Sequence, residues 1–523
     1  MNESRRRFLL HSGLVGSAVL SGLTTAVFAQ DESRTLIIAL GRQTGNLDPV
    51  VYKAIWSVQS MIFEPLIRYG AGGVIEPALA EAWEVSEDGL QLRFVLRQGV
   101  TFSDGTPWDA DSLKWNLDRW IGKDDHSWLL ISAAYDRLEI LGSHEVVIHL
   151  KEPVPSALAE LTTVRPVRFM SPKGVAADGT FAEPIGTGPW KVIVNNDART
   201  ELARNDSYWG PLPEYEKVDM IVIPNARSRV DALRSGNIDI TGGVFVAALS
   251  PQDAKTLQSS GAVVESATGT DTLVLGFNPQ REILQDPRVR EAISICLDRG
   301  AIAERLLQGF ATPTMNLFAE VIPNSGRRIP VPVRDPERAK ELLEEAGWTG
   351  EGTRVKDGVP LKLEMVISED AVAGSRALGE VIQSFVRDAG IEVTLRLVDH
   401  VSRHDDIPQM NYDLALFITA GAPYDPHGSL TTYFLSTYRT GTDGKMFMDA
   451  EHLDPLVLKA LTAPEAEREA AYQGFFDWLE SNHAIAPIYH ASRIWAHSSR
   501  VKGFAIPPTE YEMPFEGITL EAN

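Results

Sequence analysis

The residues whose types could do chemistry are spread along the chain without forming a recognised catalytic motif. The sequence contains no G-x-S-x-G, no H-E-x-x-H and no G-x-x-x-x-G-K phosphate loop. Residues 186–190 read Gly-Thr-Gly-Pro-Trp, which does not match a dinucleotide-binding loop. With 71 Asp and Glu residues, no carboxylate pair stands out as a glycosidase dyad. We therefore expect a protein that is not an enzyme, with a hydrolase using an unmarked acid pair as the alternative.

One pair of histidines has the spacing of a metal site. His400 and His404 are four residues apart, so on a helix both imidazoles would lie on one face. Their position directly after an apolar run that ends at Val398 favours a solvated polar turn instead. Cys296 is the only cysteine, which excludes an intramolecular disulfide and a cysteine-rich metal site.

The N-terminus predicts export. Residues 4–10 read Ser-Arg-Arg-Arg-Phe-Leu-Leu, and a mildly apolar stretch follows up to Val-Phe-Ala at 27–29. Paired arginines before Phe-Leu are typical of a twin-arginine (Tat) signal, with an ordinary Sec signal as the alternative. We therefore expect residues 1–29 to be a cleaved signal and the mature protein to be periplasmic. No later run of about 18 apolar residues predicts a membrane span.

Composition further narrows the classes of protein and partner that the chain fits. The chain has 523 residues, and 49 Lys and Arg against 71 Asp and Glu give a net charge of −22. This acidic balance argues against nucleic acid as a partner, because phosphate binding needs clustered basic residues. A 44% hydrophobic and 23% charged chain is globular, and its length predicts two or three domains.

The elements that must position any site alternate between strand and helix. An apolar run at 35–40 is typical of a strand, and alternation at 92–96 after a turn signal at 87–89 predicts one arm of a hairpin. Asp109 has the position of a cap before an amphipathic helix that reaches Trp120. We expect further strands at 145–150, 218–222, 273–277, 361–367, 391–397, 413–418 and 485–504, and helices at 228–235, 287–299, 335–346 and 373–389. This alternation predicts α/β domains with mixed sheets.

Five segments occur in an order that is specific to one family. They read Glu-Pro-Ala-Leu-Ala-Glu-Ala-Trp at 76–83 with Ser-Glu-Asp-Gly at 86–89, Arg-Gln-Gly-Val-Thr-Phe-Ser-Asp-Gly-Thr-Pro at 97–107, Pro-Ile-Gly-Thr-Gly-Pro-Trp at 184–190, Asp-Pro-Arg-Val-Arg-Glu-Ala-Ile at 286–293, and Asp-Pro-Glu-Arg-Ala-Lys at 335–340 with Gly-Trp at 347–348. Together they resemble the extracellular solute-binding proteins of the dipeptide/oligopeptide/nickel ABC-importer family (family 5). The resemblance covers essentially all of residues 32–523.

The resemblance implies an α/β, two-lobed periplasmic binding protein fold with mixed sheets and a hinge between the lobes. Lobe I would be large, with a core formed by 30–62, 188–275 and 490–523 and an extra subdomain at 63–187. Lobe II would be formed by 276–489. The two lobes are expected to close on a small-molecule ligand.

Local segments resemble the nickel-binding subgroup of this family. Residues 165–169 read Arg-Pro-Val-Arg-Phe, and the resemblance implies that Arg165 contacts carboxylates of a metal-chelating molecule. It also implies that Trp128, Tyr424 and Tyr511 line the cleft, through His-Ser-Trp at 126–128, Gly-Ala-Pro-Tyr-Asp-Pro-His at 421–427 and Glu-Met-Pro-Phe-Glu at 512–516. A guanidinium binds a carboxylate bidentately, and aromatic walls exclude water from the pair. A structural ion pair for Arg165 and plain lobe packing for Trp128 and Tyr424 are the alternatives.

The chain departs from the subgroup at several cleft positions. The metal-ligating histidine of the subgroup falls on Tyr438, and a phenol is a poor nickel ligand at neutral pH. A cleft arginine falls on Asp125, which favours an amine on the ligand, and a cleft methionine falls on Trp56. A further cleft tryptophan falls on Ala420. His427, in the cleft loop, and the His400/His404 pair are the nearby substitutes for the histidine of the subgroup, with a packed turn histidine as the alternative for His427.

Two receptor hypotheses and one enzyme hypothesis follow. The first is a receptor that delivers a chelated, nickel-type transition metal to an inner-membrane ABC permease and its ATPases. The second is the same receptor for short peptides, opines or other amino-bearing carboxylates without metal. The third is a secreted hydrolase. We expect no resident cofactor, with nickel present only as part of a bound chelate, and a monomer that binds no nucleic acid.

Overall fold

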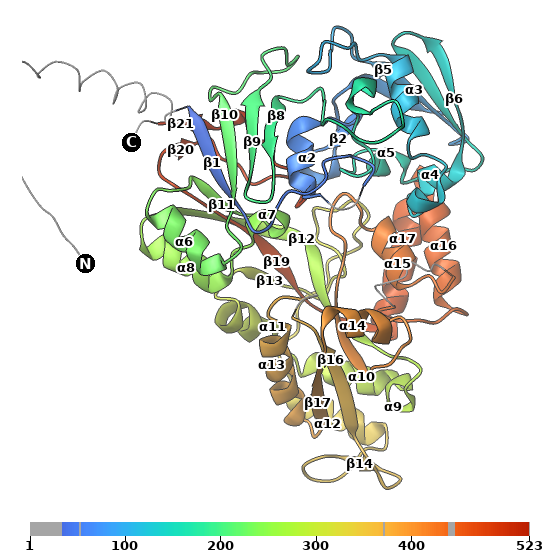
Figure 1. Cartoon of the computed structure of the whole chain (residues 1–523). Helices are drawn as coiled ribbons and strands as arrows, with labels where there is room; N and C mark the ends of the chain where they lie inside the picture. Colours follow the sequence, from blue (N-terminus) through green and yellow to red (C-terminus); the bar gives the residue numbers. More distant parts are fainter. Residues whose placement is uncertain (1–33, 52–53, 370–371, 438–444, 522–523) are drawn as a thin grey trace, which may run out of the picture.

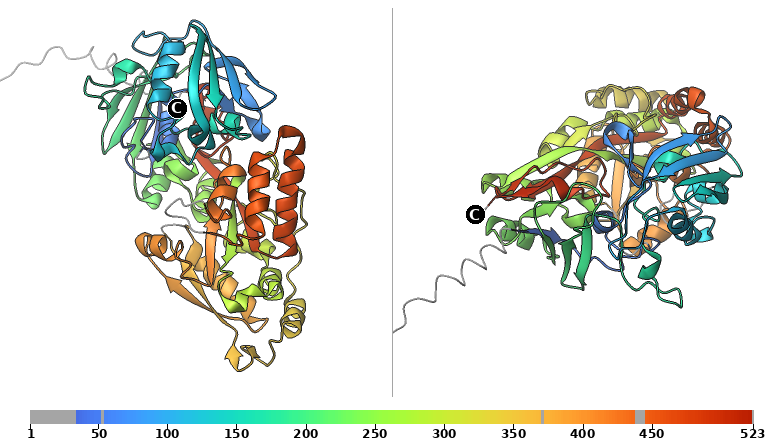
Figure 2. Two further views of the ribbon diagram at one scale, coloured as in Figure 1. Left: turned by 90° about the vertical axis from the view of Figure 1, so that its right-hand side faces the viewer. Right: turned by 90° about the horizontal axis from the view of Figure 1, so that it is seen from above.

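The computed structural model describes residues 34–51, 54–369, 372–437 and 445–521. The predicted signal at 1–29 and Tyr438 therefore lie outside the described residues. The chain folds into two lobes of mixed α/β structure, stacked one above the other in Figure 1 and in the left view of Figure 2. Among the described residues, no helix is both long and apolar enough to pass through a membrane.

One mixed sheet of eleven strands runs through both lobes, in the order β17-β16-β18-β12-β19-β11-β1-β10-β9-β8, with β13 paired to β19. The first lobe provides β1 (Thr35–Leu40), β8 (Trp190–Asn195), β9 (Arg199–Arg204), β10 (Lys217–Val222) and β11 (Ile240–Gly242), with helices α2 (Trp56–Ile62), α6 (Ala226–Arg234), α7 (Val244–Ala247) and α8 (Pro251–Ser259). The C-terminal part of the chain returns to this lobe through β20 (Val501–Lys502), η5 (Phe515–Gly517) and β21 (Thr519–Leu520).

A separate four-stranded sheet, in the order β4-β5-β7-β6, forms an extra subdomain on the first lobe. Its elements are β2 (Ile67–Tyr69), η1 (Ala71–Gly73), β3 (Ile75–Pro77), β4 (Ala80–Val85), β5 (Gln91–Leu96), α3 (Ala110–Asp118), η2 (Asp124–His126), α4 (Leu130–Ala134), β6 (Tyr135–Gly142), β7 (Glu145–Leu150), α5 (Ala157–Glu160) and η3 (Pro172–Gly174). Strand β5 alternates between exposed and buried residues, and its apolar face covers a core of its own. The predicted hairpin arm at 92–96 is confirmed.

The second lobe contains the largest hydrophobic core. Its elements are α9 (Glu282–Gln285), α10 (Pro287–Ile295), α11 (Arg299–Ala301), η4 (Ile302–Leu306), β13 (Ala311–Pro313), α12 (Pro336–Glu345), β14 (Val355–Lys356), β15 (Val359–Pro360), β16 (Lys362–Ile367), α13 (Ser375–Arg387), β17 (Glu392–Leu397), α14 (His400–Asp406), β18 (Leu414–Ile418), α15 (His427–Tyr433), α16 (Leu453–Thr462) and α17 (Glu465–Ser481). The described residues form separate hydrophobic cores, and the expected division of the chain with its boundaries stays a prediction.

Two long antiparallel strands join the lobes. They are β12 (Val263–Phe277) and β19 (Ile485–His497), which cross the middle of the molecule in Figure 1. One end of β19 pairs with β11 of the first lobe, and one end of β12 pairs with β18 of the second. Their register shifts between Thr268 and Thr272, which marks an irregularity of the ladder where the chain passes between the lobes.

Helix ends follow local capping chemistry. Asp109 accepts a hydrogen bond from the backbone N–H of Ser112 at 2.9 Å, so the predicted start of α3 is confirmed. The predicted helix over 287–299 is divided, because Asp298 caps a new helix through the N–H of Ala301. The prediction of a polar turn at His400 is wrong, because Asp399 caps α14 there.

A buried acid holds the extra subdomain to the first lobe. Glu64 is 1% exposed and accepts hydrogen bonds from Arg68, Thr187, Tyr208 and Trp209 at 2.5–3.2 Å. Because Thr187 lies between two glycines, the segment at 186–188 can lie against the end of α2. The carbonyl oxygen of Ile62 accepts the N–H of Gly188 at 3.0 Å.

This close approach predicts that residue 186 must be glycine. A Cβ atom there would lie 2.0 Å from the backbone oxygen of Ile62, so Gly186→Ala must shift a backbone segment. We expect a loss of roughly 1–3 kcal/mol in the free energy of unfolding, the usual cost of overpacking. Urea unfolding followed by circular dichroism measures it.

Gly474 provides the matched control. It lies in α17, where a Cβ atom would meet nothing within 4 Å. Gly474→Ala should therefore stabilise the chain by about 0.5–1 kcal/mol, the difference in helix propensity. Equal stability of the two variants would contradict the packing of 186–188 against α2.

Candidate functional site

An aromatic cluster lies where the first lobe meets the second. Trp56 begins α2, Phe245 lies in α7, and Tyr511 lies in the C-terminal segment; their rings stack with centroids 4.8–5.7 Å apart. Tyr424, from the loop after β18, meets Tyr511 edge-on at 4.9 Å, and Trp128 lies 5.9 Å from Tyr424. We call these five residues the aromatic cluster. They come from both lobes, so the cluster exists as a unit when the lobes are together.

Tyr511 connects the lobes directly. Its hydroxyl donates a hydrogen bond of 2.6 Å to the backbone oxygen of Ala420, in the loop after β18. Burial raises the pKa of Tyr511 well above its usual value, and Tyr424 and nearby carboxylates raise it further. Tyr511 is therefore a neutral hydrogen-bond donor at physiological pH.

Arg165 lies within this apolar surrounding. Only 2% of the residue is exposed, and its guanidinium carbon lies 3.9 Å from the ring centroid of Trp56. One of its terminal nitrogens donates to the backbone oxygen of Val51 at 3.4 Å. Stacking on an indole face holds a guanidinium flat, and the N–H groups along the edge of a guanidinium pair with planar acceptors. A carboxylate is the acceptor that this edge fits best.

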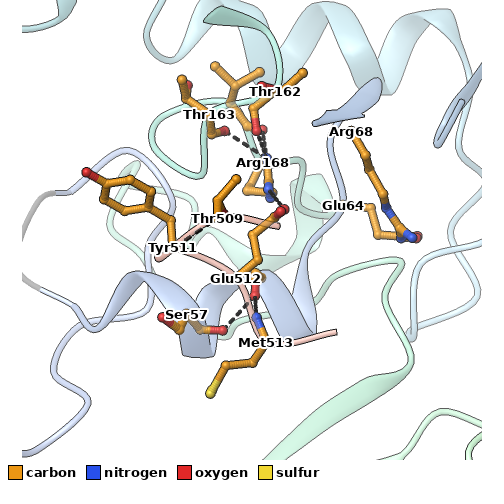
Figure 3. A network of polar contacts seen from close by, with 12 residues as sticks. Ser57, Glu64, Arg68, Thr162, Thr163, Arg168, Thr509, Tyr511, Glu512 and Met513 are labelled. Atoms are coloured by element: carbon orange, nitrogen blue, oxygen red, sulfur yellow. Dashed lines mark hydrogen bonds and ion pairs between the residues drawn. The ribbon is translucent and has the colours of Figure 1, made fainter. Parts of the chain in front are cut away.

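A second buried arginine positions both Arg165 and Tyr511. Arg168 donates to the backbone oxygens of Thr162, Thr163 and Val167 at 2.7–3.2 Å, and to Glu512 at 2.6 Å (Figure 3). The three carbonyls fix the loop that carries Arg165. The ion pair with Glu512 joins this loop to the C-terminal segment that carries Tyr511. Arg168 therefore has a structural role, and the ion pair closes a loop of 344 residues.

Three buried carboxylates lie beside the cluster. Glu510 accepts hydrogen bonds from the backbone N–H and the hydroxyl of Thr270 at 2.9–3.0 Å, and that hydroxyl accepts the N–H of Ala422 at 2.9 Å. Asp425 accepts the N–H of Gly421 at 2.7 Å. Burial raises the pKa of Asp425 to about 7. Burial and the nearby Glu510 raise the pKa of Asp271 to about 7 as well. We call Asp271, Asp425 and Glu510 the acidic cluster.

His427 has a buried position at the start of α15. Its Nε2 atom lies 3.9 Å from a carboxylate oxygen of Glu160, a residue of the first lobe that is itself 1% exposed. Burial lowers the pKa of His427 to about 4 and raises that of Glu160 to about 7. The imidazole is therefore neutral at pH 7. Among the described residues, no group of three or more His, Cys, Asp or Glu side chains converges as a metal site would require.

The structure thus brings together five of the predicted site residues and does not place Asp125 among them. Arg165, Trp56, Trp128, Tyr424 and Tyr511 are in one place, although a ligand contact by any of them stays a prediction. Asp125 lies in η2 with an exposed side chain, and Tyr438 lies outside the described residues.

Sequence reasoning did not find Phe245, Asp271 and Glu510. Phe245 is 41% exposed, and nothing in its local sequence marks it as part of an aromatic stack. Asp271 had a usable signal, because Gly-Thr-Asp at 269–271 interrupts a strand pattern with polar residues. Glu510 directly precedes Tyr511, so it could have been considered with that residue.

Comparison with known proteins assigns this architecture to a family. Residues 74–441 match the family described as "Bacterial extracellular solute-binding proteins, family 5 Middle". The chain is 30% identical over 487 residues to the nickel-binding periplasmic protein of Escherichia coli, covering 91% of this chain and 92% of the relative. It is 25% identical over 509 residues to the probable di/tripeptide-binding protein 5 of Pseudomonas aeruginosa, covering 91% and 93%.

Solved structures agree with the family in fold. An ABC transporter substrate-binding protein from Sinorhizobium meliloti superposes with a TM-score of 0.85 at 48% identity, covering 93% of this chain and all of the other. NikA from Brucella suis in complex with Fe(III)-EDTA gives a TM-score of 0.84 at 30% identity, with the same coverage. The chain is therefore a bacterial extracellular solute-binding protein of family 5, the substrate-binding component of an ABC importer.

Proposed function

We propose that this protein captures a carboxylate-bearing chelate of a nickel-type transition metal between its lobes in the periplasm. It would deliver that chelate to an inner-membrane permease driven by ATPases. The observation that carries the proposal is the buried guanidinium of Arg165 inside the aromatic cluster. A buried guanidinium among aromatic side chains at the boundary between the lobes suits an anionic small molecule.

The chelator supplies the metal ligands in this proposal. The described residues contain no converging group of three candidate ligands, and His427 has one carboxylate neighbour at 3.9 Å. Nickel prefers imidazole and other nitrogen ligands to a phenol, so Tyr438 is a poor substitute for a histidine. The relatives include both a nickel-binding protein and a structure holding Fe(III)-EDTA, which is a polycarboxylate chelate. Protein residues would then recognise the chelate by its shape and carboxylates.

A second candidate ligand is a metal-free amino-bearing carboxylate, such as a short peptide or an opine. The acidic cluster beside the aromatic cluster favours it, because carboxylates attract a protonated amine. One relative is also named as a probable di/tripeptide-binding protein. In both cases the protein acts as a monomeric receptor without catalysis, resident cofactor or nucleic acid.

Replacing Arg165 tests the carboxylate contact. Arg165→Ala leaves a ligand carboxylate buried without its partner, which commonly costs about 2–5 kcal/mol in binding. We therefore expect affinity for any carboxylate ligand that binds the native protein to fall by about 30-fold or more. The affinity of Arg165→Lys should lie between those of the native protein and Arg165→Ala, because an ammonium keeps the positive charge but not the planar donor geometry of a guanidinium. Isothermal titration calorimetry measures the affinity of the native protein and of both variants.

Arg305→Ala serves as the control, since Arg305 is exposed on the second lobe. It should bind as the native protein does. Unchanged affinity in Arg165→Ala, with native circular dichroism, would assign Arg165 a purely structural role.

Titration with defined ligands separates the two candidates. We expect nickel alone to bind weakly, because the described side chains offer no complete ligand set. Nickel with free histidine should bind tightly if the ligand is a chelate. Tight binding of a dipeptide mixture, with nickel making no difference, would instead establish the second candidate. Tight binding of nickel alone would contradict the chelate model and return attention to His427.

A further inference from the structure

We propose that Gly73 of the first lobe and Pro323 of the second form a latch that holds the lobes together independently of the ligand. Gly73 ends η1, in the turn between β2 and β3 of the extra subdomain, and Pro323 lies in the segment between β13 and α12. We call these two residues the latch. The proposal goes beyond the ligand proposed above, because protein atoms form both sides of the contact.

The first-lobe side of the latch is a hairpin turn made of glycines. Gly72 and Gly73 follow each other with φ angles of +66° and +79°, in the left-handed region that favours glycine. The N–H of Gly70 donates to the backbone oxygen of Val74 at 2.8 Å, and the N–H of Gly73 donates to that of Gly70 at 3.2 Å. The turn is therefore held in shape by its own backbone, without atoms of the second lobe.

The second-lobe side of the latch is fixed to its own lobe on both sides of Pro323. Ile322, directly before it, is 1% exposed and belongs to the hydrophobic core of the second lobe. Four residues after it, the backbone N–H of Arg327 donates to the side-chain oxygen of Gln473 in α17 at 2.9 Å. The position of Pro323 is therefore determined by the second lobe.

The two sides are in direct contact. A Cβ atom on Gly73 would lie 2.3 Å from Cγ and 2.5 Å from Cδ of Pro323, and 3.2 Å from the hydroxyl oxygen of Tyr69. Carbon atoms in favourable contact are about 3.5–4.0 Å apart, so the ring of Pro323 fills the space that a side chain at position 73 would need. A proline ring cannot rotate away, because it is bonded to its own backbone nitrogen. The contact therefore requires glycine at position 73.

The latch is separate from the candidate site. Within the site the lobes are joined by the hydrogen bond from Tyr511 to Ala420 and by the packing of Trp128 on Tyr424. Neither residue of the latch belongs to the aromatic cluster or the acidic cluster. A ligand that binds in the site does not need to touch the latch, so the latch stabilises the closed form equally for every ligand.

Such a contact changes affinity without changing selectivity. When the binding-competent form is only partly populated, the apparent affinity of any ligand falls in proportion to that population. Loss of the latch should therefore weaken the binding of a chelate and of a dipeptide by the same factor. A clash at the latch opposes only the closed form, and overpacking of this size corresponds to a decrease of about fivefold or more in the closure equilibrium.

Crosslinking across the latch measures closure directly. Val74 and Val321 lie beside the contact and are 61% and 53% exposed, so Val74→Cys with Val321→Cys places one accessible thiol on each lobe. Cys296 is fully buried, and burial raises the pKa of its thiol to about 12, so the native cysteine does not compete. A short bis-maleimide should join the two new thiols at a rate that follows the population of the closed form. Mass spectrometry of the full chain measures that rate, and no ligand is added.

In this two-cysteine background, Gly73→Ala should crosslink about fivefold or more slowly. Gly72→Ala is the matched control, because it carries the same left-handed strain but its Cβ atom meets nothing within 4 Å. It should crosslink at the rate of the background. Pro323→Ala removes Cγ and Cδ, so Gly73→Ala combined with Pro323→Ala should crosslink faster than Gly73→Ala alone, as residues in direct contact require.

Equal rates in Gly73→Ala and Gly72→Ala would overturn the latch. So would a slow rate in Gly73→Ala that Pro323→Ala fails to restore, because the effect would then arise in the turn and not at the contact. Melting temperatures show which variants are folded. If Gly73→Ala is not folded, Pro323→Ala alone decides: loss of the ring contact should slow crosslinking by about twofold or more, and an unchanged rate would overturn the proposal.

Discussion

The pairing of β12 with β19 is the constraint on which the rest of the molecule depends. These two strands belong to the sheets of both lobes, so the eleven strands form one hydrogen-bonded unit instead of two sheets joined by a linker. Movement between the lobes must therefore occur by bending of this ladder. The register of this ladder shifts between Thr268 and Thr272, and the acidic cluster lies beside that irregularity.

Buried charges divide into two kinds around this hinge. The two terminal nitrogens of Arg168 donate to three carbonyls and to Glu512, so Arg168 fixes the loop that carries Arg165. Arg165 is buried as well; its guanidinium stacks on Trp56 and donates to the backbone oxygen of Val51. The acidic cluster consists of carboxyl groups, whose charge is opposite in sign to that of Arg165.

Individual strands and helix ends could be predicted from the sequence wherever a single local rule, such as apolar patterning or helix capping, determined them. The strand at Glu145–Leu150 and the cap at Asp109 follow from apolar patterning and capping. Family resemblance located Arg165, Tyr424 and Tyr511. The acidic cluster was not predictable in this way, because Asp271 and Glu510 are 239 residues apart and meet only through tertiary structure. Helix α14 was missed for a different reason, since Asp399 caps it at a position where composition alone indicates a turn.

The C-terminal segment has a consequence for biosynthesis. Glu510, Tyr511 and Glu512 follow almost all other described residues in the chain, yet they complete the acidic cluster, the aromatic cluster and the buried ion pair. A nascent chain that reaches only residue 509 therefore lacks these contacts, however well its earlier segments have folded. A stop codon at position 510 would remove these contacts while leaving most of the hydrophobic cores intact.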